Sequence, residues 1–185
     1  MKYLPKLKGE LVFLSPICVD DAERYAAWLN DLATTRFLTL ASAQVSVHGE
    51  REALAALSKS HNYAIVERST ESLLGNCGLM DVDHLNRTAE VGIFIGDESS
   101  RGKGYGTEAL GLLADYAFNV LNIQNLMLKT YAYNEAGLRC YRKSGFREVG
   151  RRRSSHFYGG AYHDEIFMDL LASDFGPSRL PPARG

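Results

Sequence analysis

The stretch Arg101-Gly102-Lys103-Gly104-Tyr105-Gly106 lies between residues 91–95, an apolar run typical of a strand, and a long amphipathic helix pattern that ends near Leu121. Three alternating glycines remove every Cβ from one side of the loop, so its backbone N–H groups can approach a ligand closely. A helix that begins directly after the loop adds unpaired N–H donors and a dipole that favours anions. Two cationic side chains add formal positive charge. The stretch therefore predicts an anion site, and a pyrophosphate fits it best.

The composition predicts one soluble globular domain. The chain has 185 residues, of which 45% are hydrophobic and 23% charged, and its formal charge is −1. It therefore has no overall attraction for nucleic acid or anionic membranes. Cys18, Cys77 and Cys140 are far apart and form no Cys-x-x-Cys pair, which argues against a disulfide scaffold or a zinc ribbon. We expect no signal peptide and no membrane span, and we assign the protein to the cytoplasm.

Hydrophobic periodicity and turn residues predict a mixed α/β domain over residues 1–173. Short polar turns join three consecutive strands before the glycine loop, which indicates an antiparallel meander. Ser46 and Asn134 are expected to cap helices, as is Asp20 or Asp21. From residue 174 the chain has three prolines and no apolar period, so we expect a disordered tail over 174–185. The predicted strands are 10–15, 62–66, 73–82, 88–96, 126–133, 146–158 and 162–171. Five helices are predicted: one covers residues 32–38, and the other four end at or near residues 29, 57, 121 and 145.

Two common phosphate-binding motifs are alternatives for the loop. A P-loop is excluded because no Gly-Lys-Ser/Thr follows at the required spacing. The segment Gly104-Tyr-Gly-Thr-Glu-Ala109 does match the dinucleotide pattern Gly-x-Gly-x-x-Ala. That pattern should follow a strand almost directly and open a parallel βαβ unit whose second strand ends in an acidic residue. Here residues 97–100 intervene, and the next predicted strand ends in Tyr131-Ala-Tyr-Asn134. The context disfavours a dinucleotide site.

Two motifs carry a resemblance to a known family. Arg101-x-x-Gly104-x-Gly106 matches the signature Gln/Arg-x-x-Gly-x-Gly/Ala of the GNAT superfamily of acetyl-CoA-dependent N-acetyltransferases. Asn134-Glu-Ala-Gly-Leu-Arg-Cys-Tyr141-Arg-Lys-Ser-Gly145-Phe146 resembles a second family pattern, Asn-x-x-Ala-x-x-x-Tyr-x-x-x-Gly-Phe. It departs at one place: either Gly137 holds the usual alanine position, or Ala136 serves with an offset of one residue. Within the superfamily the chain most resembles the RimJ/RimL-like branch, whose members acetylate protein N-termini, and the relatives of that branch that acetylate spermidine or other small amines.

The resemblance implies a fold and a cofactor. The fold is a single mixed, mostly antiparallel sheet, flanked by helices and splayed open between its fourth and fifth strands, where the pantetheine of acetyl-CoA lies. Backbone groups of the fourth strand would bind the pantetheine amides, the loop would bind the pyrophosphate, and no metal would take part. The implied cofactor-binding residues are Ile93, Phe94, Ile95, Arg101, Gly102, Lys103, Gly104, Tyr105, Gly106, Thr107 and Asn134.

The resemblance also implies that Tyr141 is a general acid. Asn134 and Tyr141 are seven residues apart, so both face the same side of their helix. A phenol with an ordinary pKa near 10 stays protonated at neutral pH and can donate a proton to a thiolate, whose ordinary pKa is near 8.5. Without the family motif, Tyr141 would be interpreted as a core aromatic.

The general base has one candidate, Glu90, which opens the strand before the loop and would act through water. The alternative is that Glu90 is an outward strand residue paired with a neighbouring cation. Some relatives carry a glutamate at this position. Lys129 stands on the fifth strand, where some peptide acetyltransferases have a glutamate, and this difference speaks against a simple transfer of their mechanism.

The acceptor site is expected between the first helices and the final hairpin, which leaves the acceptor itself open. A polyamine would call for several carboxylates in the first helical region, but Asp31 is the only acidic residue among residues 28–40. Spermidine is therefore disfavoured as the acceptor, and a peptide N-terminus, an aminoglycoside and other small amines remain open. A monomer and a homodimer are both compatible with the sequence. A non-catalytic acyl-CoA sensor and a dinucleotide-binding protein are the alternative functions. The candidate acceptor residues are Trp28, Phe37, His156, Tyr158, Tyr162 and Asp164.

Overall fold

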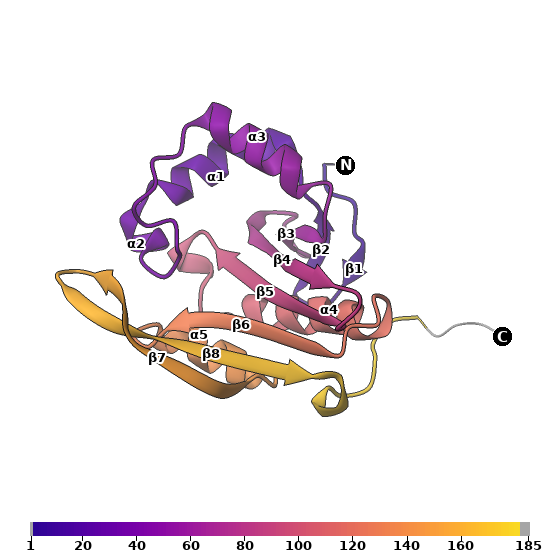
Figure 1. The fold of residues 1–185 in the computed structure, drawn as a ribbon. Coiled ribbons are helices and arrows are strands. Elements are labelled where there is room, and N and C mark those ends of the chain that lie inside the picture. The colour runs from indigo at the N-terminus through magenta and orange to yellow at the C-terminus, as the bar shows by residue number, and fades with distance from the viewer. Residues whose placement is uncertain (1, 182–185) are drawn as a thin grey trace.

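The structure, a computed structural model that describes residues 2–181, is built on one sheet of eight strands (Figure 1). The strand order is β1-β2-β3-β4-β5-β6-β8-β7. The strands are β1 (Leu7–Lys8), β2 (Val12–Pro16), β3 (Asn62–Glu67), β4 (Leu73–Asp83), β5 (Thr88–Ile95), β6 (Asn125–Tyr131), β7 (Arg147–Tyr158) and β8 (Ala161–Leu171).

The sheet opens between β5 and β6, which form the parallel pair of an otherwise antiparallel sheet over the described residues. Their pairing begins at Thr88 with Asn125 and ends at Glu90 with Met127. Past that point β5 stays paired with β4 as far as Ile95, while β6 stays paired with β8 as far as Tyr131. The two strands therefore diverge after Glu90. The predicted mixed, mostly antiparallel sheet with a splay between its fourth and fifth predicted strands is confirmed.

Helices cover both faces of the sheet because its central strands are apolar on both sides. Phe13 and Val66 belong to a core cluster with residues of α1 and α3, whereas Leu14 and Ile65 belong to the cluster that contains residues of α4 and α5. This alternation is the period of two that a strand imposes on its side chains. The helices are α1 (Ala22–Leu29), α2 (Leu32–Thr35), α3 (Val47–Leu57), α4 (Tyr105–Asn119) and α5 (Glu135–Lys143).

Two of the predicted helix caps form as expected. Ser46 Oγ accepts a hydrogen bond from Gly49 N at 3.0 Å, and Asn134 Oδ1 accepts one from Gly137 N at 3.0 Å. The predicted cap of α1 is wrong: neither Asp20 nor Asp21 makes a capping hydrogen bond at the start of that helix. Asp21 is buried instead and accepts a hydrogen bond from the hydroxyl of Tyr3 at 3.1 Å.

The first long strand begins two residues later than predicted because Glu108 holds the residues before it in a turn. The Glu108 carboxylate accepts hydrogen bonds from the backbone N–H groups of Glu10, Leu11 and Val12 at 2.9, 2.8 and 2.7 Å. This contact ties the β1–β2 turn to the first turn of α4, directly behind the glycine loop. β1 itself, only two residues long, was not predicted.

The segment after β8 packs against α4, although the sequence predicted a disordered tail from residue 174. Phe175 lies 5.3 Å from Phe118, centroid to centroid, and the backbone N–H of Arg179 donates to Asp115 Oδ2 at 2.7 Å. Apolar and polar contacts thus anchor a segment that has no apolar period of its own. Residues 182–185 of the predicted tail lie outside the described residues. No helix between residues 2 and 181 has the length and the apolar character to cross a membrane.

Candidate active site

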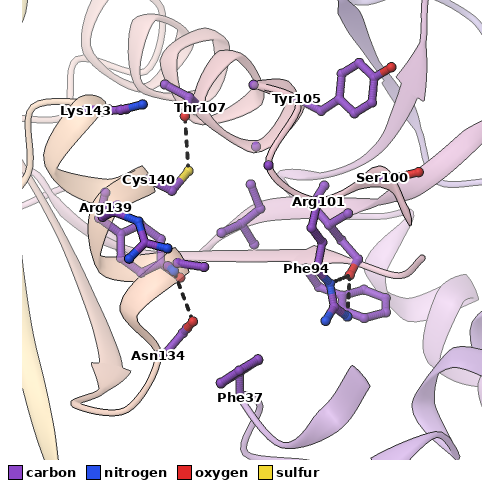
Figure 2. A pocket seen from close by; sticks show the side chains of 18 of the residues that line it. Phe37, Phe94, Ser100, Arg101, Tyr105, Thr107, Asn134, Arg139, Cys140 and Lys143 are labelled. Carbon is purple, nitrogen blue, oxygen red and sulfur yellow. Dashed lines mark hydrogen bonds between the residues drawn. The ribbon is translucent and has the colours of Figure 1, made fainter. Parts of the chain in front are cut away.

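A cleft of about 350 Å³ lies where β5 separates from β6 and the glycine loop turns into α4 (Figure 2). We call it the loop cleft. The end of β5 and the loop form one side, α5 forms another, and Phe37, just after α2, lies at its margin. The predicted cofactor-binding residues that line it are Ile93, Phe94, Ile95, Arg101, Gly102, Gly104, Tyr105, Gly106, Thr107 and Asn134, and Tyr141 lines it as well.

Backbone geometry favours glycine at two positions of the loop, and the third glycine leaves room in the cleft. Gly102 and Gly104 have φ of +76° and +91°, values that side chains rarely allow. Gly106 has an ordinary conformation, but a Cβ there would lie 3.5 Å from Cys140 Sγ and 3.8 Å from Ile93 Cδ1, both in the wall of the cleft. No side chain caps the start of α4, so its first N–H groups remain available to an anion.

Only one of the two loop cations lines the cleft, and its charged group is engaged within the protein. The Arg101 guanidinium donates hydrogen bonds to the carbonyl oxygen of Ile95 (Figure 2) and to that of Gly96, both at 3.2 Å, which fastens the loop to the end of β5. Lys103 does not line the cleft. Two further cations do, Arg139 and Lys143, which are one turn apart on α5. Their spacing of four residues on the helix of Tyr141 was the signal that could have found them.

A second cleft, of about 420 Å³, lies against α3 and the inner parts of β4, β5 and β6. We call it the α3 cleft. It shares five lining residues with the loop cleft, namely Phe37, Leu38, Ile93, Phe94 and Tyr141. The two clefts therefore meet at the splay between β5 and β6, and a ligand in each would face the other across these residues.

Tyr141 is held at this junction from the last turn of α5. The residue is 9% exposed. Burial raises the pKa of Tyr141 to about 12, while the neighbouring Thr130 side chain acts in the opposite direction. The phenol is thus protonated across the physiological range and can serve as a proton donor.

Asn134 lines the loop cleft, but its side-chain groups are already engaged within the protein. Its Oδ1 accepts from Gly137 N, and its Nδ2 donates to Thr130 Oγ1 at 3.1 Å. A Cβ at Gly137 would collide with this side chain, which explains why glycine replaces the usual alanine there. Asn134 therefore positions the start of α5 and, through it, Tyr141.

Glu90 is paired with a neighbouring cation, as the second interpretation of the sequence expected. Its carboxylate forms an ion pair with Lys129, with Oε1 3.4 Å from Nζ across the parallel β5–β6 ladder. Both residues also line the α3 cleft. The cation that the sequence placed on the fifth strand is thus the partner of the candidate base.

Of the six predicted acceptor residues, Phe37 alone lines either of these two clefts. Trp28 belongs to the core, where its Nε1 donates to Asp97 Oδ1 at 2.9 Å and its ring fills the space beside Gly96. Asp164 stabilises the final hairpin by accepting from Ser154 N at 2.9 Å. The sequence could not place these side chains because their contacts are distant along the chain.

The other three predicted acceptor residues lie on the final hairpin, which projects beyond the sheet (Figure 1). The His156 ring stacks on Tyr131 with centroids 3.7 Å apart, and Tyr158 continues the stack through Tyr133. Tyr162 is 69% exposed and packs against Phe157. Tyr131 is the member of this aromatic stack that lines the α3 cleft.

Comparisons with known proteins agree with the motifs and the geometry. A family model described as "Acetyltransferase (GNAT) domain" matches residues 12–147. The chain belongs to the GNAT acetyltransferase family. The resemblance noted from the two motifs is confirmed, together with the GNAT fold and the assignment to an acetyltransferase family.

Several bacterial GNAT proteins are similar to the chain. Spermidine N(1)-acetyltransferase of Escherichia coli K12 is 34% identical over 141 residues, which cover 72% of this chain and 75% of that protein. The probable N-acetyltransferase YjcK of Bacillus subtilis is 26% identical over 91% of this chain and 98% of its own length. The crystal structure of spermidine N-acetyltransferase from Vibrio cholerae in complex with CoA and spermine has a TM-score of 0.79 at 20% identity, covering 90% of this chain and 99% of that one. At that identity the likeness shows the fold.

Proposed function

We propose that this GNAT protein transfers the acetyl group of acetyl-CoA directly to a primary amine held in the α3 cleft, with Tyr141 between the two ligands. The observation that carries the proposal is the position of Tyr141, which lines both clefts. A group that serves both the donor and the acceptor has to lie where their sites meet.

The loop cleft fits the donor. The first N–H groups of α4 and the loop that begins at Gly102 would bind the pyrophosphate, with the Arg139 and Lys143 cations nearby. Past Glu90, the side of β5 that faces β6 is released from the ladder, so backbone groups of residues 93–95 would bind the pantetheine amides. When bound, acetyl-CoA supplies the acetyl group: the amine nitrogen bonds to the carbonyl carbon, the C–S bond breaks, the amine loses a proton and the sulfur gains one.

Two side chains would handle these protons. Tyr141 is protonated because burial raises its pKa to about 12, and it would donate to the leaving sulfur. Glu90 lines the α3 cleft and would accept the amine proton through water, with its carboxylate oriented by Lys129. Asn134 would act as a positioning residue that holds α5 at its first turn.

The proposed class of acceptor is a primary amine, and the names of two relatives support this class. The Escherichia coli relative is a spermidine N(1)-acetyltransferase. YdaF of Bacillus subtilis, 33% identical over 56% of each chain, is named as a putative ribosomal N-acetyltransferase. We also propose, from the three free cysteines, a reducing cytoplasmic location.

The experiment that tests this function measures free thiol released from acetyl-CoA with a panel of peptides, polyamines and aminoglycosides, and confirms the acetylated product by mass spectrometry. The proposal predicts turnover with at least one amine and a product heavier by one acetyl group. CoA binding with no turnover on any amine would instead make the chain an acyl-CoA sensor. Stabilisation by NAD and not by CoA would refute the donor site.

A further inference from the structure

Glu50 is a buried carboxylate in the wall of the α3 cleft. It lies in the first turn of α3 and is 6% exposed. Within residues 2–181, no hydrogen-bond donor or cation contacts its carboxylate, whose oxygens are not among the solvent-excluded unpaired atoms and so keep some contact with the cleft; its backbone N–H donates to Ser46 O. Burial alone raises the pKa of the Glu50 carboxyl. Carboxylates are rarely buried without a partner because the loss of hydration is costly.

The charges around the α3 cleft leave Glu50 uncompensated. The cleft has three charged lining residues, of which Glu90 and Lys129 neutralise each other in their ion pair. The rest of the lining is neutral and largely apolar, including Leu38, Met80 and Phe94. The cleft therefore presents one unpaired carboxylate at α3 in a lining that is otherwise neutral and largely apolar.

A carboxylate in this position suits a cation that is not the reacting group. The reacting amine must be neutral to attack a carbonyl, whereas a neighbouring carboxylate favours the charged ammonium. Glu50 also lines only the α3 cleft and is not among the residues shared at the junction. An acceptor with two amino groups meets both requirements, because one amine reaches the junction while the other stays protonated at Glu50.

We propose that Glu50 binds the second, non-reacting ammonium of the acceptor, and that the protein therefore acetylates aliphatic di- or polyamines in preference to monoamines. This inference rests on the proposed function and narrows its acceptor class. It also revises the view from the sequence, which looked for acidic residues only among positions 28–40 and so disfavoured spermidine. Glu50 stands outside that stretch, and the fold brings it to the cleft.

The test compares α,ω-diaminoalkanes of three to six carbons with 1-aminoalkanes of the same length, which differ only in the second charge. Thiol release gives kcat and KM for the wild type and for the Glu50→Gln variant. A charge-assisted contact corresponds to a preference of about 10-fold or more in kcat/KM. We expect the wild type to show that preference and Glu50→Gln to lose it through a higher diamine KM, with monoamine turnover unchanged.

The matched control is Glu52→Gln. Glu52 lies on the same helix as Glu50, and its side chain is 74% exposed. This control should leave the preference intact. CoA affinity and circular dichroism report whether Glu50→Gln is folded, which we expect because the Glu50 carboxylate has no partner to lose. Equal losses of kcat on diamines and monoamines would make Glu50 a base and overturn the inference.

The remaining outcomes separate this inference from the proposed function. An unchanged diamine preference in Glu50→Gln would overturn the inference, and so would wild-type turnover of peptides or aminoglycosides with none of the diamines. Both results would leave the acetyltransferase function intact. Absence of turnover on every amine would overturn the proposed function itself.

Discussion

Gly106 on α4 faces Cys140 on α5 across the loop cleft, and a Cβ at Gly106 would lie 3.5 Å from Cys140 Sγ. The conformation of Gly106 is helical and unstrained, so a side chain there would enter the cleft without distorting the loop. The absence of a side chain at Gly106 thus keeps this part of the cleft open.

Gly106→Val should weaken CoA binding by at least about 10-fold, because two methyl groups would occupy the cleft. Calorimetric titration with CoA measures the effect. Gly111→Ala is the matched control, since a Cβ at Gly111 of the same helix meets nothing within 4 Å. It should raise the free energy of unfolding by about 0.5–1 kcal/mol and leave CoA affinity unchanged. Equal CoA affinity in both variants would remove Gly106 from the donor site.

Glu108→Gln should lower the free energy of unfolding by about 1–3 kcal/mol, because three backbone N–H groups lose a shared anionic acceptor. Urea denaturation provides the measurement. Glu135→Gln removes a glutamate from the first turn of α5, where its side chain is 79% exposed, and should change stability by less than about 0.5 kcal/mol. A similar loss in the two variants would contradict a special role for the Glu108 contact.

Phe175→Ala should lower the free energy of unfolding by about 1–2 kcal/mol, because the ring packs on Phe118 of α4. Phe157→Ala, at a phenylalanine that is 60% exposed on the hairpin, is the control and should have a smaller effect. If Phe175→Ala were no more destabilising than the control, the segment after residue 174 would contribute nothing to the domain.

The proton on Tyr141 predicts a loss of stability at alkaline pH. The pKa of Tyr141 rises from an ordinary 10.0 to about 12 in the folded protein, so the unfolded chain releases this proton first as the pH rises. Its contribution to stability is complete below pH 10 and is lost as the pH rises toward 12. Denaturant titrations from pH 8 to 11.5 should show this decline, and Tyr141→Phe should reduce its slope. An identical slope in the variant would show that Tyr141 is not protected by burial.

The local features of the fold could be predicted because they depend on neighbours in the sequence. Ser46 and Asn134 cap helices through bonds to residues three positions later, and Gly104 adopts the positive φ that glycine permits. The antiparallel meander followed from short polar turns. The family motifs then added the splay after Glu90, which periodicity alone does not indicate.

The features that the sequence did not predict depend on contacts between distant residues. Arg101 turns back to β5 because two carbonyl oxygens at the end of that strand need donors. Trp28 is held in the core by Asp97. Glu50 reaches the α3 cleft only because α3 packs over the sheet. Side-chain identity alone gives no information on such distances, so more of the predicted cofactor residues than of the predicted acceptor residues line a cleft.

The central claim is that Tyr141 donates a proton at the junction of the two clefts. The most direct test measures the steady-state kinetics of the Tyr141→Phe variant and, by titration, its affinity for CoA. Tyr116→Phe is the control, since Tyr116 is equally buried at 9% exposure and lines neither cleft. We predict that Tyr141→Phe lowers kcat by about 10²–10⁴ with CoA affinity unchanged, while Tyr116→Phe keeps wild-type turnover. Wild-type turnover in folded Tyr141→Phe would contradict the mechanism.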